Sequence, residues 1–139
     1  MDGVFHDTVG HHILLDVWGV PFETLNDLDG MRDLLREAAR ISGATVVEET
    51  FHRFPVQGLS GVLVLAESHI SVHTTPEHGY ASFDVFTCGE NMRPSEAARY
   101  LIEALPTSRY YLREFVRGTE AGIVEAALPQ PVAASAAAR

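Results

Sequence analysis

The stretch LSGVLVLAESHISVHTTPEHGYASFDVFTCG, residues 59–89, decides the fold of this chain. It contains three segments rich in apolar and β-branched residues, which begin at Leu59, His69 and Gly79. Glycine and proline residues separate the segments, as turn residues separate strands. The stretch therefore predicts three strands that follow one another along the chain.

Further strands are expected on both sides of this block. Residues 11–20 and 45–54 have the same apolar, β-branched character. Residues 109–116 alternate between polar and apolar side chains and carry three arginines if the segment is followed to Arg117. Charged side chains of this kind suit the edge of a sheet, so we expect this last strand at an edge.

Two helices are expected. Apolar residues recur at helical spacing over residues 28–41 and end before Gly43, a residue typical of a helix C-terminus. A second helix should begin near Pro94 and end before Pro106, with its inward face formed by Ala97, Leu101, Ala104 and Leu105. The order of elements predicts an α+β fold, a two-layer sandwich in which two main helices cover one face of a largely antiparallel sheet.

The length and composition indicate a single domain. The chain has 139 residues, of which 46% are hydrophobic, and this is enough for one modest core. We assign residues 1–118 to this domain. Residues 119–139 are rich in alanine and proline without an apolar period, and we expect them to form a mobile tail.

The charges exclude some partners and one cofactor. The net charge of −9 disfavours binding to nucleic acid phosphates or to an anionic membrane. All ten basic residues are arginines, so the sequence has no lysine. Enzymes that use pyridoxal phosphate anchor it on a lysine amine, and this chain has none to offer.

The single cysteine and the N-terminal residues bear on location. Cys88 has no partner for an intramolecular disulfide or for a CxxC motif. The first residues have no basic segment followed by an apolar core, and no apolar run reaches the roughly 18 residues that would span a membrane. We therefore expect a cytoplasmic protein.

Several motifs resemble one known family. The segments GHHILLDVWG, FHRF, ESHISVH, PEHGYA and DVFTCG occur in an order and at spacings similar to those of the prokaryotic S-adenosylmethionine decarboxylase proenzymes. The resemblance extends from about Gly10 to Gly118. It implies self-cleavage between Glu67 and Ser68.

The resemblance also implies a cofactor made from the chain itself. Attack of the Ser68 hydroxyl on the Glu67 carbonyl gives an ester, and β-elimination of that ester leaves dehydroalanine, which hydrolyses to a pyruvoyl group. This carbonyl condenses with a substrate amine and draws off electrons as carbon dioxide leaves. The implied activity is decarboxylation of S-adenosylmethionine, which supplies the aminopropyl donor for spermidine synthesis. Neither pyridoxal phosphate nor a metal is expected.

Roles for five other residues follow from the same resemblance. His73 would assist self-cleavage by removing the α-proton, Ser60 would support the same step, and Cys88 would reprotonate the decarboxylated carbon. Phe54 would stack on the adenine of the substrate, and Glu77 would hold the ribose hydroxyls. Family members assemble as dimers of processed protomers, so a homodimer is expected.

Residue chemistry leaves other interpretations open. A lone cysteine such as Cys88 is often a small buried hydrophobe. The histidines His69, His73 and His78 suggest a metal site, although no companion motif supports one. Strand alternation places His69, Ser71 and His73 on one face and Ser68 on the other, so a turn or bulge would have to bring Ser68 and His73 together.

The substrate and the activity have alternatives as well. The family has Trp where this chain has Thr75, and usually Tyr where it has His78. A smaller aromatic surface suits ornithine or arginine, which relatives within the family decarboxylate. A binding protein on the same fold that has lost catalysis is a third possibility, and it would remain one uncut chain.

Overall fold

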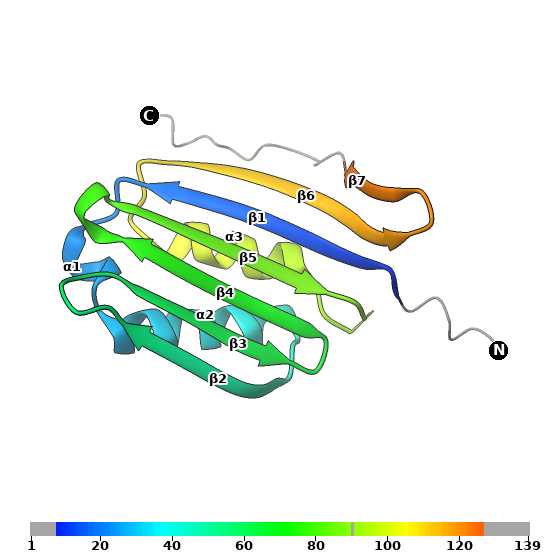
Figure 1. Ribbon diagram of the computed structural model, residues 1–139, viewed down its shortest axis with the longest axis horizontal. Helices are drawn as coiled ribbons and strands as arrows, with labels where there is room; N and C mark the ends of the chain where they lie inside the picture. Colours follow the sequence, from blue (N-terminus) through cyan, green and yellow to red (C-terminus); the bar gives the residue numbers. More distant parts are fainter. Residues whose placement is uncertain (1–7, 90, 127–139) are drawn as a thin grey trace.

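The structure of the protein, a computed structural model, describes residues 8–89 and 91–126. Strands are more abundant than helices in this part of the chain, and two longer helices lie behind the strands in the view of Figure 1. The elements in chain order are β1 (Gly10–Trp18), α1 (Phe22–Leu25), α2 (Leu28–Ser42), β2 (Val46–Arg53), β3 (Leu59–Leu65), β4 (Ser68–Thr75), the 3₁₀ helix η2 (Pro76–His78), β5 (Tyr80–Thr87), α3 (Pro94–Ala104), β6 (Arg109–Thr119) and β7 (Gly122–Ala126).

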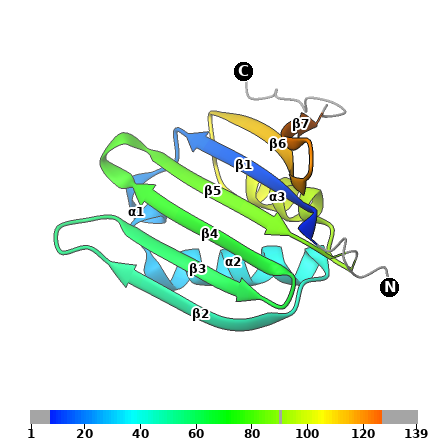
Figure 2. The same ribbon diagram turned by 45° about the vertical axis from the view of Figure 1, so that its right-hand side comes forward.

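The strands form one antiparallel sheet. Its order is β2-β3-β4-β5-β1-β6-β7, and every neighbouring pair is antiparallel. The first strand, β1, therefore lies in the interior of the sheet, between β5 and β6. The predicted α+β sandwich is confirmed, with α2 and α3 on one face of the sheet (Figure 2).

The core lies between the helices and the sheet. Alternate residues of each central strand are buried on the helix side, so that β5 buries Ala81, Phe83, Val85 and Thr87. The helices bury one stripe each, which is why both have an apolar face at helical spacing. This arrangement leaves the odd-numbered residues of β4 on the opposite, uncovered face.

The limits of α2 follow from its terminal residues. The Asp27 side chain accepts a hydrogen bond from the Gly30 N–H at 3.1 Å, as expected of an N-cap. Gly43 closes the helix with φ of 87°, in the left-handed region that glycine adopts without strain. The predicted end of this helix is confirmed.

The C-terminal part differs from the prediction. The β6 strand continues to Thr119, and residues 122–126 form β7, which pairs with it. The structured part therefore extends beyond residue 118, and β6 is not an edge strand because β7 covers its outer side. The rest of the predicted tail, residues 127–139, lies outside the described residues.

One helix position was also wrong. Ala104, expected to face inward, is exposed, and Ala98 is buried in its place. The buried stripe of α3 consists of Ala97, Ala98 and Leu101, and Leu105 continues it just beyond the helix. Ala104 lies at the last position of α3.

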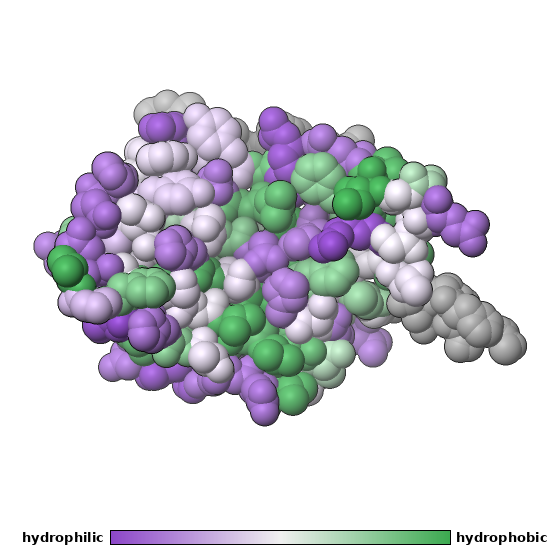
Figure 3. All heavy atoms as spheres, in the orientation of Figure 1, coloured by the Kyte–Doolittle hydropathy of each residue, from purple (hydrophilic) through white to green (hydrophobic). Residues whose placement is uncertain are grey.

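The face of the sheet opposite the helices, which we call the open face, carries no described element. It presents apolar side chains to solvent, including Leu14, Val64 and Tyr111, which are 44%, 41% and 53% exposed. Figure 3 views this side and shows apolar patches between polar ones. In the described part of the chain, no helix has the length and apolar character needed to cross a membrane.

Candidate active site

The Glu67–Ser68 bond lies directly after a tight turn. Leu65 at the end of β3 pairs with Ser68 at the start of β4, so only Ala66 and Glu67 connect the two strands. Ser68 has φ of +156°, the one positive value at a non-glycine residue among residues 8–89 and 91–126. L-residues rarely adopt this conformation, and such residues are concentrated at functional sites.

Three hydrogen bonds hold Glu67 and the residue before it. The Cys88 N–H donates to the Glu67 carbonyl oxygen at 3.0 Å. The Thr45 N–H donates to the Glu67 carboxylate at 3.1 Å, and the Ala66 N–H donates to the Thr45 carbonyl at 2.9 Å. We call this group of Glu67, Ser68 and Cys88 the cleavage end of β4. Cys88 is exposed here, so it is not the buried hydrophobe that a lone cysteine often is.

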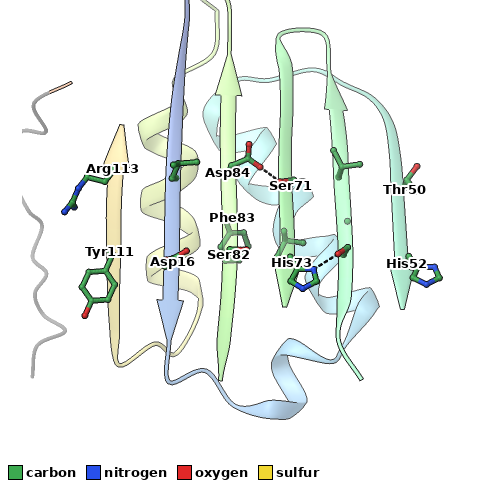
Figure 4. Close-up of a pocket in the computed structure, with 15 residues that line it drawn as sticks. Asp16, Thr50, His52, Ser71, His73, Ser82, Phe83, Asp84, Tyr111 and Arg113 are labelled. Atoms are coloured by element: carbon green, nitrogen blue, oxygen red, sulfur yellow. Dashed lines mark hydrogen bonds between the residues drawn. The ribbon is translucent and has the colours of Figure 1, made fainter. Parts of the chain in front are cut away.

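A second group lies near the other end of β4. His73 Nδ1 and Ser60 Oγ are 2.6 Å apart across the β3–β4 pair. The His73 side chain points from the open face (Figure 4), and the alternation of buried residues in β3 places Ser60 on the same face. The Phe54 ring lies edge-on to the His73 ring, with centroids 6.0 Å apart. The two residues predicted to support self-cleavage, His73 and Ser60, are thus brought into direct contact.

The predicted substrate residues lie at the same end. Phe54 begins a turn in which its N–H donates to the Gly58 carbonyl at 2.9 Å. Gly58, with φ of +94°, lies between the Phe54 ring and Pro76 of η2, and a side chain at this position would meet both. Glu77 is exposed in η2, next to this turn. We call the group of Phe54, Ser60, His73 and Glu77 the His73 end of β4.

The cleavage end and the His73 end are far apart within one copy of the chain. Ser68 and His73 are five residues apart on the same strand, which separates their Cα atoms by roughly 17 Å at the rise of a β-strand. The turn at Ala66 and Glu67 does not shorten this distance, because Ser68 and His73 both belong to β4, which follows the turn. The expectation that a turn or bulge would bring Ser68 and His73 together is therefore wrong for a single copy.

A shallow cavity of about 720 Å³ lies between the two ends on the open face. Its lining includes Ser60 and His73 on one side and Asp16, Tyr111 and Arg113 on the other (Figure 4). Tyr80 donates to the Asp16 carboxylate at 2.9 Å, and burial together with this hydrogen bond raises the pKa of Tyr80. The cavity is thus polar at both sides, and Ser71, Ser82 and Asp84 of the strands between them also line it.

Asp84 is the centre of a hydrogen-bond network near the cleavage end. Its carboxylate accepts from His12 Nε2 at 2.6 Å, from His69 Nε2 at 2.9 Å and from the Ser71 hydroxyl. Burial acts to raise the pKa of Asp84, but the hydrogen bonds from His69, Ser71 and His12 outweigh burial and hold it well below its ordinary value of 3.8. The network joins β1, β4 and β5.

The same network is the group of described residues that best suits a metal. His12, His69 and Asp84 place their ligand atoms within 4.8 Å of one another, whereas the set suggested by the sequence also required His73 and His78. However, Arg117 lies 2.9 Å from His12 Nδ1, and arginine can only donate. His12 therefore accepts at Nδ1 and carries its proton on Nε2, where a metal would need a lone pair. The geometry favours a hydrogen-bond network.

Sequence reasoning missed this network almost entirely. The alternation of β4 placed His69 and Ser71 on one face, which is correct. Asp84, which binds both, lies on another strand, 15 residues after His69. His12, the third residue to contact Asp84, lies 72 residues before it. The sequence does offer one signal for the network: Asp84 is the only charged residue in the segment that forms β5, and a charge in such a segment needs polar partners from elsewhere in the fold.

Comparison with known proteins connects these groups to one family. The family profile described as S-adenosylmethionine decarboxylase matches residues 11–118. A protein named S-adenosylmethionine decarboxylase proenzyme 2 from Halalkalibacterium halodurans is 44% identical over 112 residues, which are 81% of this chain and 88% of that protein. The S-adenosylmethionine decarboxylase proenzyme of Moorella thermoacetica is 46% identical over 110 residues, 79% of this chain and 88% of that protein.

Solved structures agree with this match. The crystal structure of the adenosylmethionine decarboxylase from Aquifex aeolicus aligns with a TM-score of 0.72 at 37% identity and covers 88% of this chain and 98% of that chain. A Trypanosoma brucei AdoMetDC monomer aligns with a TM-score of 0.56 at 11% identity, over 76% of this chain and 45% of that one. The second likeness concerns the fold alone.

Proposed function

Because the chain belongs to the S-adenosylmethionine decarboxylase family, we propose that it cuts itself between Glu67 and Ser68 and decarboxylates S-adenosylmethionine with a pyruvoyl group made from Ser68. The protein is a self-processing, pyruvoyl-dependent carboxy-lyase, as its relatives are. The observation that carries the residue assignment is the hydrogen bond between Ser60 and His73, two residues that the resemblance had assigned to one step. The product would supply the aminopropyl donor for spermidine synthesis.

The position of Ser68 suits such a cofactor. Ser68 is the first residue of β4, directly after a two-residue turn, so a cut before it removes no strand pairing within the sheet. The new N-terminus would stay anchored, because Ser68 pairs with Thr87 and His69 pairs with Phe86. When present, the pyruvoyl carbonyl reacts with the substrate amine and accepts the electron pair freed as carbon dioxide leaves.

Self-cleavage proceeds in two steps in this proposal. The Ser68 Oγ attacks the Glu67 carbonyl carbon, the bond from that carbon to the Ser68 nitrogen breaks, and the hydroxyl proton moves to this nitrogen. His73 then removes the α-proton of Ser68, and the bond from Cβ to Oγ breaks, which releases Glu67 as a carboxylate. The resulting double bond rearranges, and water replaces the nitrogen, which leaves as ammonia.

A second copy of the chain would complete the site. Roughly 17 Å separates Ser68 from His73 within one copy, too far for proton transfer between them. His73 and Ser60 lie on the open face, which also exposes Leu14, Val64 and Tyr111. In a two-fold dimer formed through this face, with strand directions reversed, the cleavage end of one copy would meet the His73 end of its partner. We therefore propose a homodimer with two shared sites.

The shared site assigns roles to the remaining residues. Cys88 lies beside the scissile bond and is exposed, so its thiol can reprotonate the decarboxylated carbon. Phe54 and Glu77 of the second copy would bind the adenine and ribose of the substrate. No residue in this scheme has to bind a metal or pyridoxal phosphate, and we expect the enzyme to act in the cytoplasm.

Ornithine or arginine is the alternative substrate. Thr75, which is half-buried at the end of β4, stands where the family has Trp, so the His73 end has lost aromatic surface. The test is to incubate the protein with S-adenosylmethionine, ornithine and arginine side by side, measure carbon dioxide, and record the intact mass. Two fragments, residues 1–67 and 68–139, together with turnover of S-adenosylmethionine are expected. A chain that remains uncut would contradict the proposal and indicate a binding protein instead.

A further inference from the structure

We propose that Asn26 is a positioning residue for substrate recognition, because it fixes the loop that carries Phe54. This inference rests on the proposed function, in which Phe54 binds the adenine of the substrate. The observation that carries it is a pair of hydrogen bonds that join one asparagine to both ends of the loop. Arg53, just before the loop, donates through Nη1 to the Asn26 carbonyl at 2.6 Å. The Gly58 N–H, at the far end, donates to the Asn26 side-chain oxygen at 2.9 Å.

The loop between β2 and β3, residues 54–58, depends on hydrogen bonds at its two ends. Its tip packs against little, since Pro55 is exposed and Val56 is 85% exposed. The Phe54 N–H closes the loop by donating to the Gly58 carbonyl at 2.9 Å. Gly58 is buried, so its N–H needs a partner, and the Asn26 side chain supplies one. The position of the whole loop therefore follows the position of Asn26.

Asn26 is itself attached to the core. It follows α1 directly, and its N–H donates to the Phe22 carbonyl at 3.0 Å. The preceding residue, Leu25, is 0% exposed. Figure 1 shows α1 at the same end of the sheet as the loop between β2 and β3. The two hydrogen bonds from Asn26 thus connect an exposed loop to a helix end that is anchored in the core.

The Phe54 ring explains why such an attachment matters for binding. The ring lies edge-on to the rings of His52 and His73, with centroids 4.9 and 6.0 Å away. Phe54 is only half-buried, so part of its ring remains accessible to a ligand. A ring on a loop that is already ordered binds more tightly, because no entropy is then lost in ordering the loop during binding. Asn26 should therefore affect substrate affinity and leave the chemical step unchanged.

The test removes or keeps the side-chain acceptor at position 26. N26A removes the oxygen that binds the Gly58 N–H, whereas N26D keeps an oxygen that can accept from it. The matched control is N91A, which changes an exposed residue, the other asparagine of the chain. R53M removes the second hydrogen bond at an exposed position without leaving a buried group unpaired, so it keeps the test available if N26A does not fold. Thermal unfolding compares the folding of these variants.

The readout is the pair of constants kcat and KM for S-adenosylmethionine, calculated per mole of the fragment 68–139. We expect N26A to raise KM about 5-fold and to change kcat less than about 2-fold, because the lost hydrogen bond loosens the ring and touches no reacting atom. R53M should raise KM by a smaller factor. N26D and N91A should keep the KM of the unaltered protein. An unchanged KM in N26A and R53M, or a fall in kcat at unchanged KM, would overturn the inference.

A double-mutant cycle separates positioning of the ring from general destabilisation. In the F54A background there is no ring to position, so adding N26A or R53M should lower kcat/KM by less than about 2-fold. A merely structural role would cost the same factor with and without the ring, and that result would overturn the inference. If the unaltered protein does not turn over S-adenosylmethionine, the proposed function fails instead.

Discussion

The Nδ1 atom of His73 lies 2.6 Å from the Oγ atom of Ser60 on the neighbouring strand. This hydrogen bond fixes the orientation of the imidazole, which we have proposed as the base for the elimination step. We predict that H73A stalls after ester formation, with elimination slowed by at least about 100-fold. The S60A variant keeps the His73 imidazole but removes the hydrogen bond that orients it. We therefore expect cleavage of S60A to be slowed less than cleavage of H73A.

Hydroxylamine distinguishes the stalled ester from an uncut amide, because it cleaves the ester between residues 67 and 68. The matched control is H11A, which removes a half-exposed histidine that contacts Glu114 on the sheet surface. This variant should be processed at the rate of the unaltered protein. Normal processing of H73A would show that the base is elsewhere.

Sharing of the site between two copies can be tested by complementation. S68A lacks the proposed nucleophile and H73A lacks the proposed base, so we expect that neither is processed alone. In a random mixture of the two chains, roughly a quarter of the sites combine Ser68 of one copy with His73 of its partner. Mass spectrometry should then find that the H73A chain is cut and the S68A chain remains whole. Absence of cleavage in co-expressed chains that do form mixed dimers would show that the site is not shared.

Cys88→Ala separates making the cofactor from using it. The thiol is assigned to reprotonation of the product, and alanine retains the main-chain N–H that contacts Glu67. We predict that this variant still yields the two fragments but loses turnover by roughly 100-fold, because a positioned acid contributes about that factor. The remaining turnovers should place the proton wrongly and inactivate the enzyme. An unchanged turnover number would exclude the thiol as the acid.

Phe54→Ala tests the substrate. If the ring stacks on adenine, the loss of kcat/KM for S-adenosylmethionine corresponds to about 1 to 3 kcal/mol, and added S-adenosylmethionine protects the variant less against thermal unfolding. The control is F22A, which removes a ring that is 41% exposed in α1. Consumption of ornithine or arginine without S-adenosylmethionine turnover would assign the other substrate, and Phe54 would then matter only for packing.

Asp84→Asn tests the network on the open face. The pKa of Asp84 is lowered in the folded protein, so the ionised carboxylate stabilises the fold at pH values above its ordinary pKa of 3.8. The variant should lose about 2 kcal/mol at pH 7, as expected for hydrogen bonds to a charged group. Below pH 3.8 the unfolded carboxylate is protonated, so the difference from the unaltered protein should shrink as pH falls toward the folded pKa.

Urea unfolding at pH 7 and pH 3 measures this difference. D33N is the control, because the Asp33 side chain is 70% exposed and makes only long contacts of 3.9 and 4.0 Å with arginines. It should cost little at either pH. A destabilisation of D84N that is the same at both pH values would contradict the role of the ionised carboxylate.

The sequence predicted those parts of the fold that depend on local patterns. Strand alternation and turn residues located β1 to β6, and Gly43 marked the end of α2 correctly. The β7 strand was missed because GIVEA is short and stands beside an alanine-rich segment, and its stability depends on pairing with β6. Pairing between strands is a property of the folded sheet, so a local pattern does not reveal it.

The candidate site shows the same limit. The resemblance assigned Ser60 and His73 to the same step, but their separation of 13 residues along the chain does not show that the two side chains are in contact. The contact between Cys88 and Glu67 arises because β5 ends opposite the start of β4, a matter of strand register. Register and burial are fixed by packing between neighbouring strands. The periodicity of a sequence describes each strand separately and does not show how the strands align.

After a cut in the β3–β4 turn, the sheet would consist of strands from two polypeptides in alternating order. The first fragment would contribute β2 and β3 at one side and β1 in the interior, while β4, β5, β6 and β7 would belong to the second. The β1 strand would thus pair on both sides with strands of the other fragment, β5 and β6. Separation of the fragments would break three strand pairings, β3–β4, β5–β1 and β1–β6. Once unfolded, the two fragments would have to find each other by collision and thread β1 back into place. Maturation would therefore be a one-way event, in which the intact precursor folds readily and the mature enzyme depends on never having to fold again.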